Sequence, residues 1–263
     1  MVTVDNSQWV VLGIGGAALV IGVVLAFLGY RGRKKLEVME ATPTVNAADA
    51  SKMALSAPVA RVELVGVVEA DEPLLSPTSQ IPCVYYRYKL EHRKQRRERD
   101  ERTGTMKTSE FWYTVDDRKE EIPFYVSDSS GRCLVYPDGA DYIAETRTHE
   151  GRGRGRDYLE SSGVGGAILE SILSALDDDY EDVLGYRITE SLIRVGQPVY
   201  VLGTAQRSGE LAAVGKGDGP FIISHKMEAD LSRKIRRSSA LQYAFAAILA
   251  LGGIAAMVYS AFM

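Results

Sequence analysis

Two long apolar segments near the ends of the chain contain no charged side chain. The first covers residues 9–30 and the second covers residues 238–263. At about 1.5 Å of rise per helical residue, each can cross a hydrocarbon core of roughly 30 Å. The pattern therefore predicts two transmembrane helices, with the rest of the chain between them.

Between these segments, apolar positions alternate with polar ones in short runs, which is typical of half-buried strands. We expect strands over residues 61–69, 83–93, 111–115, 122–126, 133–136, 186–193, 199–205, 210–214 and 220–224. Short strands of this kind close into a barrel or a two-sheet sandwich so that open edges are avoided. The predicted fold class is mainly β, a small antiparallel barrel or sandwich with one short helix, flanked by two transmembrane α-helices.

The remaining segments divide the predicted β-rich domain, residues 61–225, from its surroundings. Residues 36–60, rich in Ala, Thr, Ser and Pro, are expected to be a linker with a short helical piece over residues 47–55. Residues 94–109 are expected to form a long charged hairpin tip. Residues 137–157 show no clear pattern, and residues 165–176 have the apolar spacing of one short helix.

Four residues are expected to set turns around the strands. The Asp-Ser-Ser-Gly run ending at Gly131 supplies the positive φ that a tight reversal needs. Gly196 and Pro198 form the turn before the strand over residues 199–205. Gly203 marks the end of the apolar part of that strand.

The basic residues predict how the helices are oriented. Residues 31–35 and residues 233–237 each carry four Lys or Arg side chains, on the side of each apolar segment that faces the middle of the chain. By the positive-inside rule, the middle is cytoplasmic and both termini lie outside. Because the basic cluster follows the first segment, we expect an uncleaved anchor, not a signal peptide.

The sequence offers little catalytic chemistry. Residues 209–217 resemble a P-loop, but their glycines are one residue too far apart and no Ser or Thr follows the lysine. The three histidines have no zinc-site spacing, and a nucleophile elbow is missing. Cys83 and Cys133 are expected to be buried thiols in a reducing compartment, with a disulfide left open. We expect no catalytic residue, cofactor or metal.

The basic runs are the candidate contact surfaces. Residues 92–102 hold seven basic side chains, counting His92, against three acidic ones, and Arg-Gly repeats begin at residue 152. The candidate contacts are Arg93, Lys94, Arg96, Arg97, Arg152 and Arg154. A solvated tip is the simplest interpretation, while a protein or anionic lipid headgroups are candidate partners. Nucleic acid is disfavoured because no aromatic residue interrupts the basic run.

Small residues recur at four-residue spacing in both apolar segments and allow helix backbones to approach closely. The stripes are Ala18, Gly22 and Ala26 in the first segment and Gly252, Ala256 and Ser260 in the second. We expect the two helices of one chain to pack together. Oligomerisation through the same stripes is the alternative.

Three blocks of the chain resemble the GIDE, or "beside a membrane" (BAM), domain family. They are GVVEADEPLLSP-x₄-PCVYYRY at residues 66–88, IPFYVSDSSGRCLVYPDGAD at 122–141 and E-x-L-I-x-x-G-x-P-V-Y-V-L-G at 190–203. The resemblance implies a β-rich domain beside a membrane, related to the membrane domain of mitochondrial RING-type E3 ubiquitin ligases. A RING needs eight Cys or His ligands, whereas this sequence has two Cys and three His. We therefore expect a domain without its own RING.

These observations predict a membrane-anchored, non-catalytic interaction or scaffold domain, in a prokaryotic cell membrane. The alternative is a component of a ubiquitin-like pathway that acts with a RING on another chain. An unrecognised hydrolase is the least favoured function because no nucleophile and base are paired in the sequence.

Overall fold

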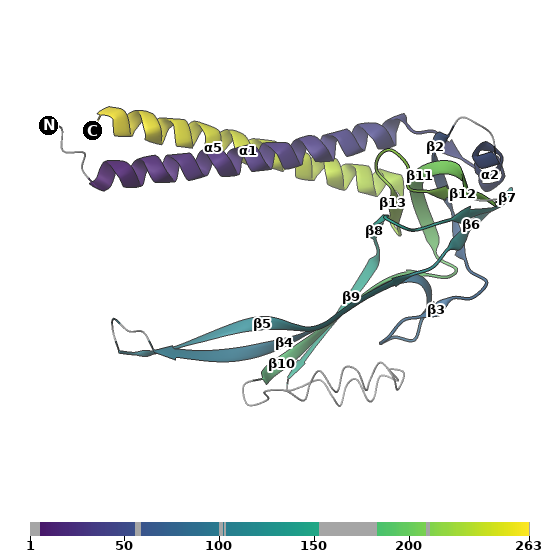
Figure 1. The fold of residues 1–263 in the computed structure, drawn as a ribbon, viewed down its shortest axis with the longest axis horizontal. Helices are drawn as coiled ribbons and strands as arrows, with labels where there is room; N and C mark the ends of the chain where they lie inside the picture. The colour runs from purple at the N-terminus through teal and green to yellow at the C-terminus, as the bar shows by residue number, and fades with distance from the viewer. Residues whose placement is uncertain are drawn as a thin grey trace. The chain divides into compact units, whose positions relative to one another are not determined.

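The computed structural model describes residues 6–55, 59–99, 102, 104–152, 183–208 and 211–262 (Figure 1). The chain forms two compact units. One unit contains Met1–Pro43 and Lys226–Met263, and the other is the β-rich unit, Thr44–His225. Arg154 and the helix expected over residues 165–176 lie outside the described residues.

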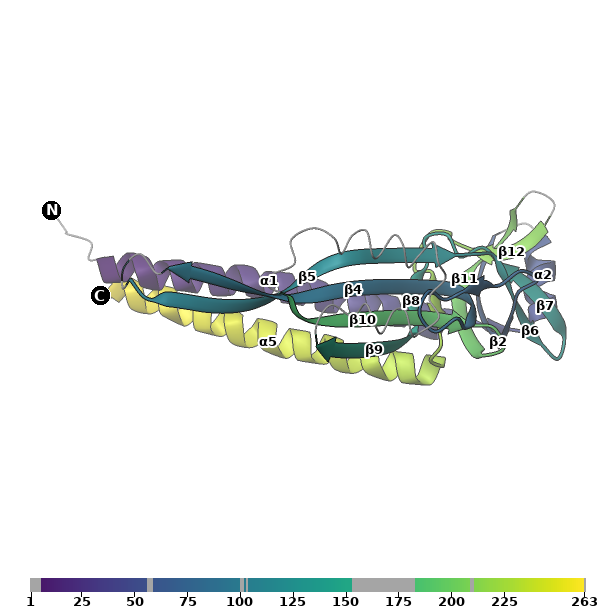
Figure 2. The same ribbon diagram turned by 90° about the horizontal axis from the view of Figure 1, so that it is seen from below.

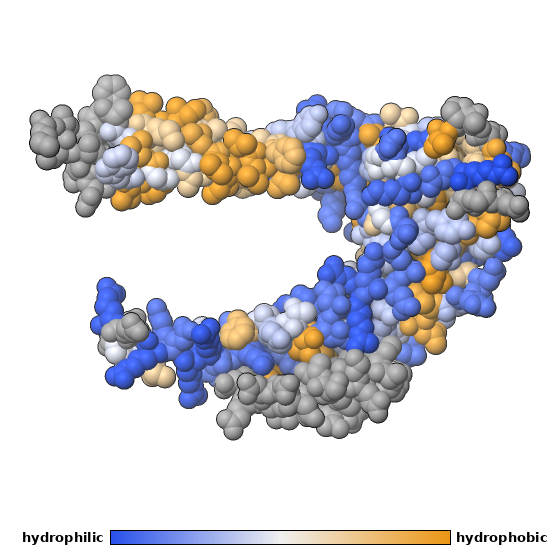
Figure 3. Space-filling model, viewed as in Figure 1, coloured by the Kyte–Doolittle hydropathy of each residue, from blue (hydrophilic) through white to orange (hydrophobic). Residues whose placement is uncertain are grey.

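The first unit is a pair of long helices, α1 (Asn6–Ala41) and α5 (Glu228–Phe262), which run antiparallel side by side (Figures 1 and 2). Both are long and apolar enough to cross a membrane, with mean hydropathies of 2.7 and 1.9 in their most apolar windows. Only 11% of each window is buried, and hydrophobic surface covers much of the pair in Figure 3. Such an exposed apolar surface is typical of helices that face lipid.

Small residues spaced seven apart line the contact between α1 and α5. They are Gly15, Gly22 and Gly29 on α1 and Ser239, Ala246, Gly253 and Ser260 on α5, all buried. A Cβ built on Gly15 would lie 3.0 Å from the Gly253 carbonyl oxygen, and one built on Gly22 would lie 3.2 Å from the Ala246 carbonyl oxygen. The helices of one chain therefore do pack together, through a close backbone approach.

The contact differs in its spacing from the expected stripes. A Cβ at Gly252 would meet nothing within 4 Å, whereas its neighbour Gly253 is buried against Gly15. Gly22 and Ser260 do belong to the buried set. A seven-residue repeat keeps one face of each helix toward its partner over many turns, whereas a four-residue repeat drifts away from it.

The β-rich unit contains one short helix, α2 (Ala47–Leu55), and thirteen strands among its described residues. The strands are β1 (Thr44–Val45), β2 (Ala60–Glu69), β3 (Leu74–Leu75), β4 (Pro82–Arg99), β5 (Met106–Glu121), β6 (Phe124–Asp128), β7 (Gly131–Val135), β8 (Asp141–Ile143), β9 (Glu145–Arg152), β10 (Val183–Arg194), β11 (Pro198–Ser208), β12 (Leu211–Gly215) and β13 (Ile222–Ser224).

Five of these strands close into a barrel. The order is β2-β6-β7-β12-β11, and β11 pairs back onto β2 to complete the ring. All of these pairings are antiparallel except the one between β7 and β12. The prediction of a mainly β protein with a small, largely antiparallel barrel is confirmed, and closure leaves these strands without open edges.

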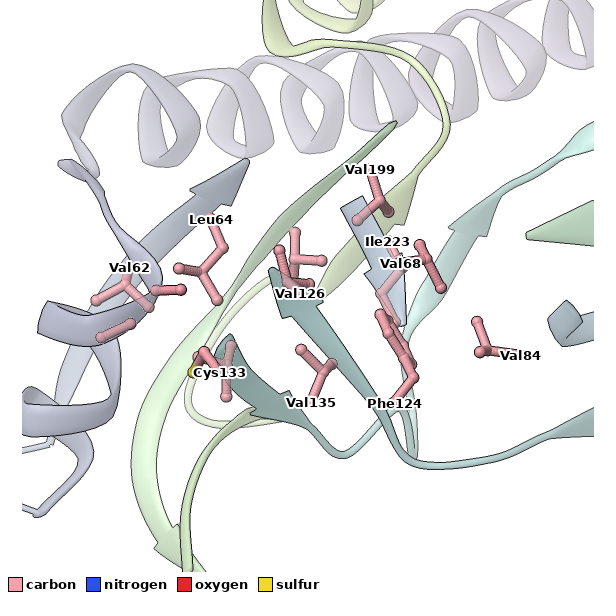
Figure 4. Close-up of a cluster of buried hydrophobic side chains, with 14 of the residues drawn as sticks. Val62, Leu64, Val68, Val84, Phe124, Val126, Cys133, Val135, Val199 and Ile223 are labelled. Carbon is pink, nitrogen blue, oxygen red and sulfur yellow. The ribbon is translucent and has the colours of Figure 1, made fainter. Parts of the chain in front are cut away.

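The barrel interior is filled by one alternating set of side chains from each strand. On β2 the set includes Val62 and Leu64, and on β11 it includes Val201, each at most 1% exposed. Phe124 of β6 is the largest side chain of this cluster among those less than 2% exposed. Figure 4 shows side chains of this cluster and the strands that carry them. Period-two alternation therefore builds one continuous core.

Helix α2 packs against the barrel with Ala47, Ala50 and Ala54 buried. The Asn46 side chain caps the helix by accepting a hydrogen bond from the Asp49 amide (2.8 Å). Part of the segment that was expected to be a linker therefore packs against the barrel, and the short helical piece expected within that segment is present. Three buried alanines are a weak hydrophobic signal, so only the packing reveals their role.

The turn between β6 and β7 also holds the start of α2. The Ala47 amide donates to Asp128 (2.8 Å), and the Ala48 amide donates to the Ser130 hydroxyl (3.0 Å). The Ser130 hydroxyl and backbone, together with the Ala47 amide, stabilise the charged carboxylate and lower the pKa of Asp128. The turn between β6 and β7, which the local sequence predicts, therefore also anchors α2, about eighty residues earlier in the chain.

The expected turn residues occupy two kinds of position. Gly131 (φ +144°) and Gly196 (φ +79°) adopt positive φ, and Pro198 is the first residue of β11. Gly203 instead lies inside β11, which continues to Ser208. A Cβ at Gly203 would lie 2.6 Å from the Val214 Cγ1, so a side chain there would collide with the barrel.

A second sheet has the order β3-β4-β10-β9, with β5 also paired to β4. Strands β4 and β5 are longer than expected, because pairing continues from Tyr85–Glu121 out to Arg99–Met106. The hairpin tip is correspondingly shorter than the expected residues 94–109. Strand β9 lies where no element was expected, and it pairs with β10 along its whole length. Cross-strand partners, more than local pattern, define these elements.

One buried carboxylate links this sheet to the loop between β3 and β4. Glu190 is 5% exposed and accepts hydrogen bonds from the Thr78 amide (3.0 Å) and the Ser79 hydroxyl (2.5 Å). The Ser79 amide adds a third donor at 3.4 Å. These donors replace the water that a buried carboxylate loses, so Glu190 holds the loop against the sheet.

Candidate interaction surface

The outer part of the second sheet is a two-stranded ribbon. We define the ribbon as residues 93–99 of β4 and residues 106–113 of β5. Residues 93–99 pair with residues 106–112 in a regular antiparallel register, and Tyr113 pairs with His92 at the inner end. The last described pairing of β10 with β4 joins Val183 to Lys94, so beyond it the described ribbon has two strands only. Its outermost residues are exposed on both faces, and the face visible in Figure 3 is largely hydrophilic.

The ribbon carries a clear excess of positive charge. It holds six Lys or Arg residues and two Glu residues. Four of the candidate contacts predicted from sequence lie here: Arg93 opposite Trp112, Lys94 opposite Phe111, Arg96 opposite Ser109 and Arg97 opposite Thr108. Arg96 is also ion-paired with Glu98 at 2.8 Å, in a solvent-exposed geometry that contributes little to stability.

Aromatic residues lie across the ribbon from the basic ones. The Lys94 Nζ lies 5.3 Å from the centre of the Tyr113 ring, and the Tyr113 side chain is 53% exposed. Phe111, 43% exposed, sits directly opposite Lys94. The basic run has no aromatic residue along its own strand, but pairing supplies them from the neighbouring strand. The sequence analysis missed this feature, because residues 111–113 were interpreted only as part of a strand.

Trp112 forms the inner end of this surface. The Arg187 guanidinium stacks over its ring at 3.9 Å from the centre, and the Arg93 guanidinium lies at 6.0 Å. Arg187 is held by Glu150 (2.6 Å) and by Glu91 (3.7 Å). Because Arg187 covers one face of the indole ring, Trp112 fixes the base of the ribbon and is poorly placed to stack on a nucleic-acid base.

The sheet also brings Arg152 to this end of the molecule. Gly185 of β10 pairs with Arg93 on one side and with Arg152 on the other. At about 4.8 Å between neighbouring strands, the two arginine backbones are roughly 10 Å apart. Two basic segments that are nearly sixty residues apart in sequence therefore belong to one surface. Arg154 lies outside the described residues.

Several buried titratable side chains of the described residues make contacts within the β-rich unit. No group of three or more His, Cys, Asp or Glu side chains among them could hold a metal ion. His92 is buried at 3% exposure, and the His225 Nδ1 lies 2.6 Å from the Ile143 carbonyl oxygen. The buried carboxylate of Glu63 accepts hydrogen bonds from the hydroxyls of Tyr200 and Thr44. These contacts hold strands together.

Both cysteines are buried and free, as expected for thiols that serve as small apolar side chains. Burial raises the pKa of Cys83 to about 12, and burial also raises the pKa of Cys133. Each thiol therefore stays protonated near neutral pH and is a poor nucleophile.

Comparison with known proteins identifies the family. A sequence model of the GIDE family, described as "E3 Ubiquitin ligase", matches residues 93–258. The matched range covers more than half of the chain, and this protein belongs to the GIDE family. The matched range begins in the ribbon and ends within α5. The sequence block at residues 66–88, which also resembles the family, therefore lies before the matched range. No curated protein and no solved structure gives a match.

Proposed function

We propose that this protein is a membrane-anchored, non-catalytic interaction domain whose ribbon binds a protein partner. The observation that carries the proposal is the ribbon itself, where six basic side chains lie near the exposed Phe111 and Tyr113 on the outer part of the sheet. Arg and aromatic side chains are enriched at protein interfaces, where rings supply contact area and Arg supplies directional hydrogen bonds. A partner with an acidic, partly apolar surface fits this chemistry.

The terminal helices supply the anchor in this proposal. Each has the length and apolar composition of a membrane span. Four Lys or Arg residues flank each apolar segment on its side toward the middle of the chain, which favours a cytoplasmic position for the β-rich unit and an outside position for both termini. A prokaryotic cell membrane remains our expectation for the location.

The experiment is site-specific photo-crosslinking of the full chain in native membranes. A benzophenone amino acid replaces Phe111 on the ribbon, and the matched control replaces Leu211 of β12, which is 53% exposed on the barrel. We expect a discrete protein adduct from position 111 and none of the same mass from position 211. Arg96→Glu together with Arg97→Glu should abolish this adduct. Identical adducts from both positions, or adducts with lipid alone, would rule out a protein-binding ribbon.

A second candidate function follows from the description of the family as an E3 ubiquitin ligase. In this alternative the chain recruits a substrate or a transfer enzyme to a RING carried by another protein. Mass spectrometry of the position 111 adduct distinguishes the two. A ubiquitin-like protein, its conjugating enzyme or a RING protein in the adduct supports the alternative, and an unrelated protein supports the general scaffold.

A further inference from the structure

The packing of α1 against α5 brings the two basic clusters to one level of the helix pair. A Cβ built on Gly32 would lie 2.5 Å from the Ser239 Oγ, so the residues just after the first apolar segment face those at the start of the second. Residues 31–35 and 233–237 thus form a collar of eight basic side chains around the pair. Residues 9–30 span about 33 Å as a helix, which would place this collar at the headgroup layer of a membrane.

A pocket of about 450 Å³ opens between the two helices at this level. Arg33 and Glu37 line it from α1, and Arg236 and Tyr243 line it from α5. The pocket lies across the change from apolar to charged sequence, with Tyr243 on the apolar side and Arg33 on the charged side. A phospholipid headgroup occupies the same boundary, and a Tyr side chain is favoured there.

The charges of the pocket indicate which headgroup fits. Its lining contains two guanidinium groups, Arg33 and Arg236, and two carboxylates, Glu37 and Glu40. A headgroup with a phosphate alone would satisfy the arginines but would face two carboxylates. A headgroup with both a phosphate and a primary ammonium can pair with both kinds of side chain. Choline is less suitable, because its trimethylated nitrogen has no N–H to donate.

The ion pairs already present can open for such a ligand. The Arg236 Nη2 lies 2.6 Å from the Glu40 Oε1, and the Arg33 Nε lies 3.9 Å from the Glu37 Oε1. The side chains of these four residues are between 47% and 70% exposed. Solvent-exposed pairs of this kind are weak, so exchanging one for a bound phosphate and ammonium costs little.

We propose that this pocket binds the headgroup of an aminophospholipid such as phosphatidylethanolamine. Arg33 and Arg236 bind the phosphate, and Glu37 and Glu40 accept hydrogen bonds from the ammonium. The pocket is separate from the ribbon, and all of its lining residues belong to α1 and α5. The inference rests on the membrane insertion that forms part of the proposed function.

The test is native mass spectrometry of the full chain in detergent, titrated with phosphatidylethanolamine, phosphatidylglycerol, phosphatidylcholine and free glycerophosphoethanolamine. Charge-assisted hydrogen bonds at both ends of the headgroup should make phosphatidylethanolamine bind at least about tenfold more tightly than phosphatidylglycerol and phosphatidylcholine. It should also bind more tightly than free glycerophosphoethanolamine, because only the lipid has acyl chains that bury apolar surface against the helices. Arg33→Gln with Arg236→Gln should remove that binding. Glu37→Gln with Glu40→Gln should remove the preference for ethanolamine over choline.

The matched control is Lys34→Gln with Arg237→Gln, which removes the same charge from the collar at positions that do not line the pocket. It should retain binding within about twofold, because phosphatidylethanolamine has no net charge at neutral pH and therefore gains little from a general attraction to basic side chains, which acts on anionic lipids. Equal losses of phosphatidylethanolamine binding in the Arg33/Arg236 variant and in the Lys34/Arg237 control would overturn the proposal. A preference for phosphatidylglycerol, or equally tight binding of free glycerophosphoethanolamine, would also overturn it.

Alkaline extraction of membranes that contain the full chain separates this inference from the proposed anchoring. A chain that alkali removes from the membrane is not inserted, and both proposals then fail. A chain that stays in the membrane without preferring phosphatidylethanolamine overturns the pocket assignment alone.

Discussion

The barrel and the ribbon are built from the same kind of strand but use their side chains in opposite ways. In the barrel each strand has a partner on both sides, and one face of every strand points into a shared core. Beyond Lys94, the two strands of the ribbon pair only with each other among the described residues, and side chains on both faces are exposed. The inward side chains of the barrel therefore contribute to stability, whereas the exposed side chains of the ribbon are accessible to other molecules.

The difference also explains why charge is concentrated in the ribbon. A long, exposed edge strand is an aggregation hazard unless charged residues interrupt it. The mixed charges of the ribbon protect its edges, and the same charges supply the proposed binding chemistry. Under the proposed function, stability and recognition thus depend on different parts of one unit.

The largest difference is expected from one matched pair of substitutions. Phe124→Ala in the barrel should lower the free energy of unfolding by about 3–5 kcal/mol, because a fully buried ring leaves a cavity. Phe111→Ala on the ribbon should change it by less than about 0.5 kcal/mol, because the ring is exposed. Denaturant titration of the full chain in detergent, followed by circular dichroism, measures both. Similar losses would show that the ribbon contributes to the folded core.

A second pair compares two glutamates of the second sheet. Glu190→Ala should destabilise the protein by about 1–3 kcal/mol, because the Thr78 amide and the Ser79 hydroxyl would lose their buried acceptor. Glu110→Ala on the ribbon removes only a long, exposed contact with Arg93 (3.7 Å) and should cost less than about 0.5 kcal/mol. Denaturant titration followed by circular dichroism measures both costs. An equal cost for both variants would contradict the structural role of Glu190.

The smallest effect concerns pH and compares two aspartates. Hydrogen bonds from Ser130 lower the pKa of Asp128, and Arg87 lowers the pKa of Asp117. A lowered folded-state pKa stabilises the protein above the ordinary Asp value near 4, and this stabilisation is lost as pH falls through the folded-state pKa. Asp128→Ala should cost about 1 kcal/mol at pH 7, since Asp128 anchors α2, and less at pH 3.

Asp117→Ala is the control for this pH dependence. Its ion pair with Arg87 (2.8 Å) is partly exposed and should contribute less than Asp128 does. Melting temperatures of both variants and the original protein at pH 7 and pH 3 provide the comparison. A cost of Asp128→Ala that grows on acidification would be inconsistent with the lowered pKa.

Several elements could be predicted because their signals are local. The strands β2, β6, β7 and β11 follow from alternation and from the Gly-containing turns beside them. The ends of β4 and β5 could not be predicted in the same way, because residues 94–99 are nearly all charged. Only the partner strand shows that they remain extended. The aromatic and basic side chains of the ribbon were visible in the sequence, but their pairing was not.

The sequence by itself determined the two apolar helices, the mainly β character of the domain, its basic clusters and its family resemblance. Each of these depends on composition or on a short-range period, which a single segment displays without its neighbours. Only the tertiary structure decided which strands close the barrel, that α2 packs against it, and that Lys94 lies beside Phe111 and Tyr113. It also decided that Arg33 and Arg236 line one pocket. These features depend on contacts between residues far apart in the chain, and register and packing set such contacts.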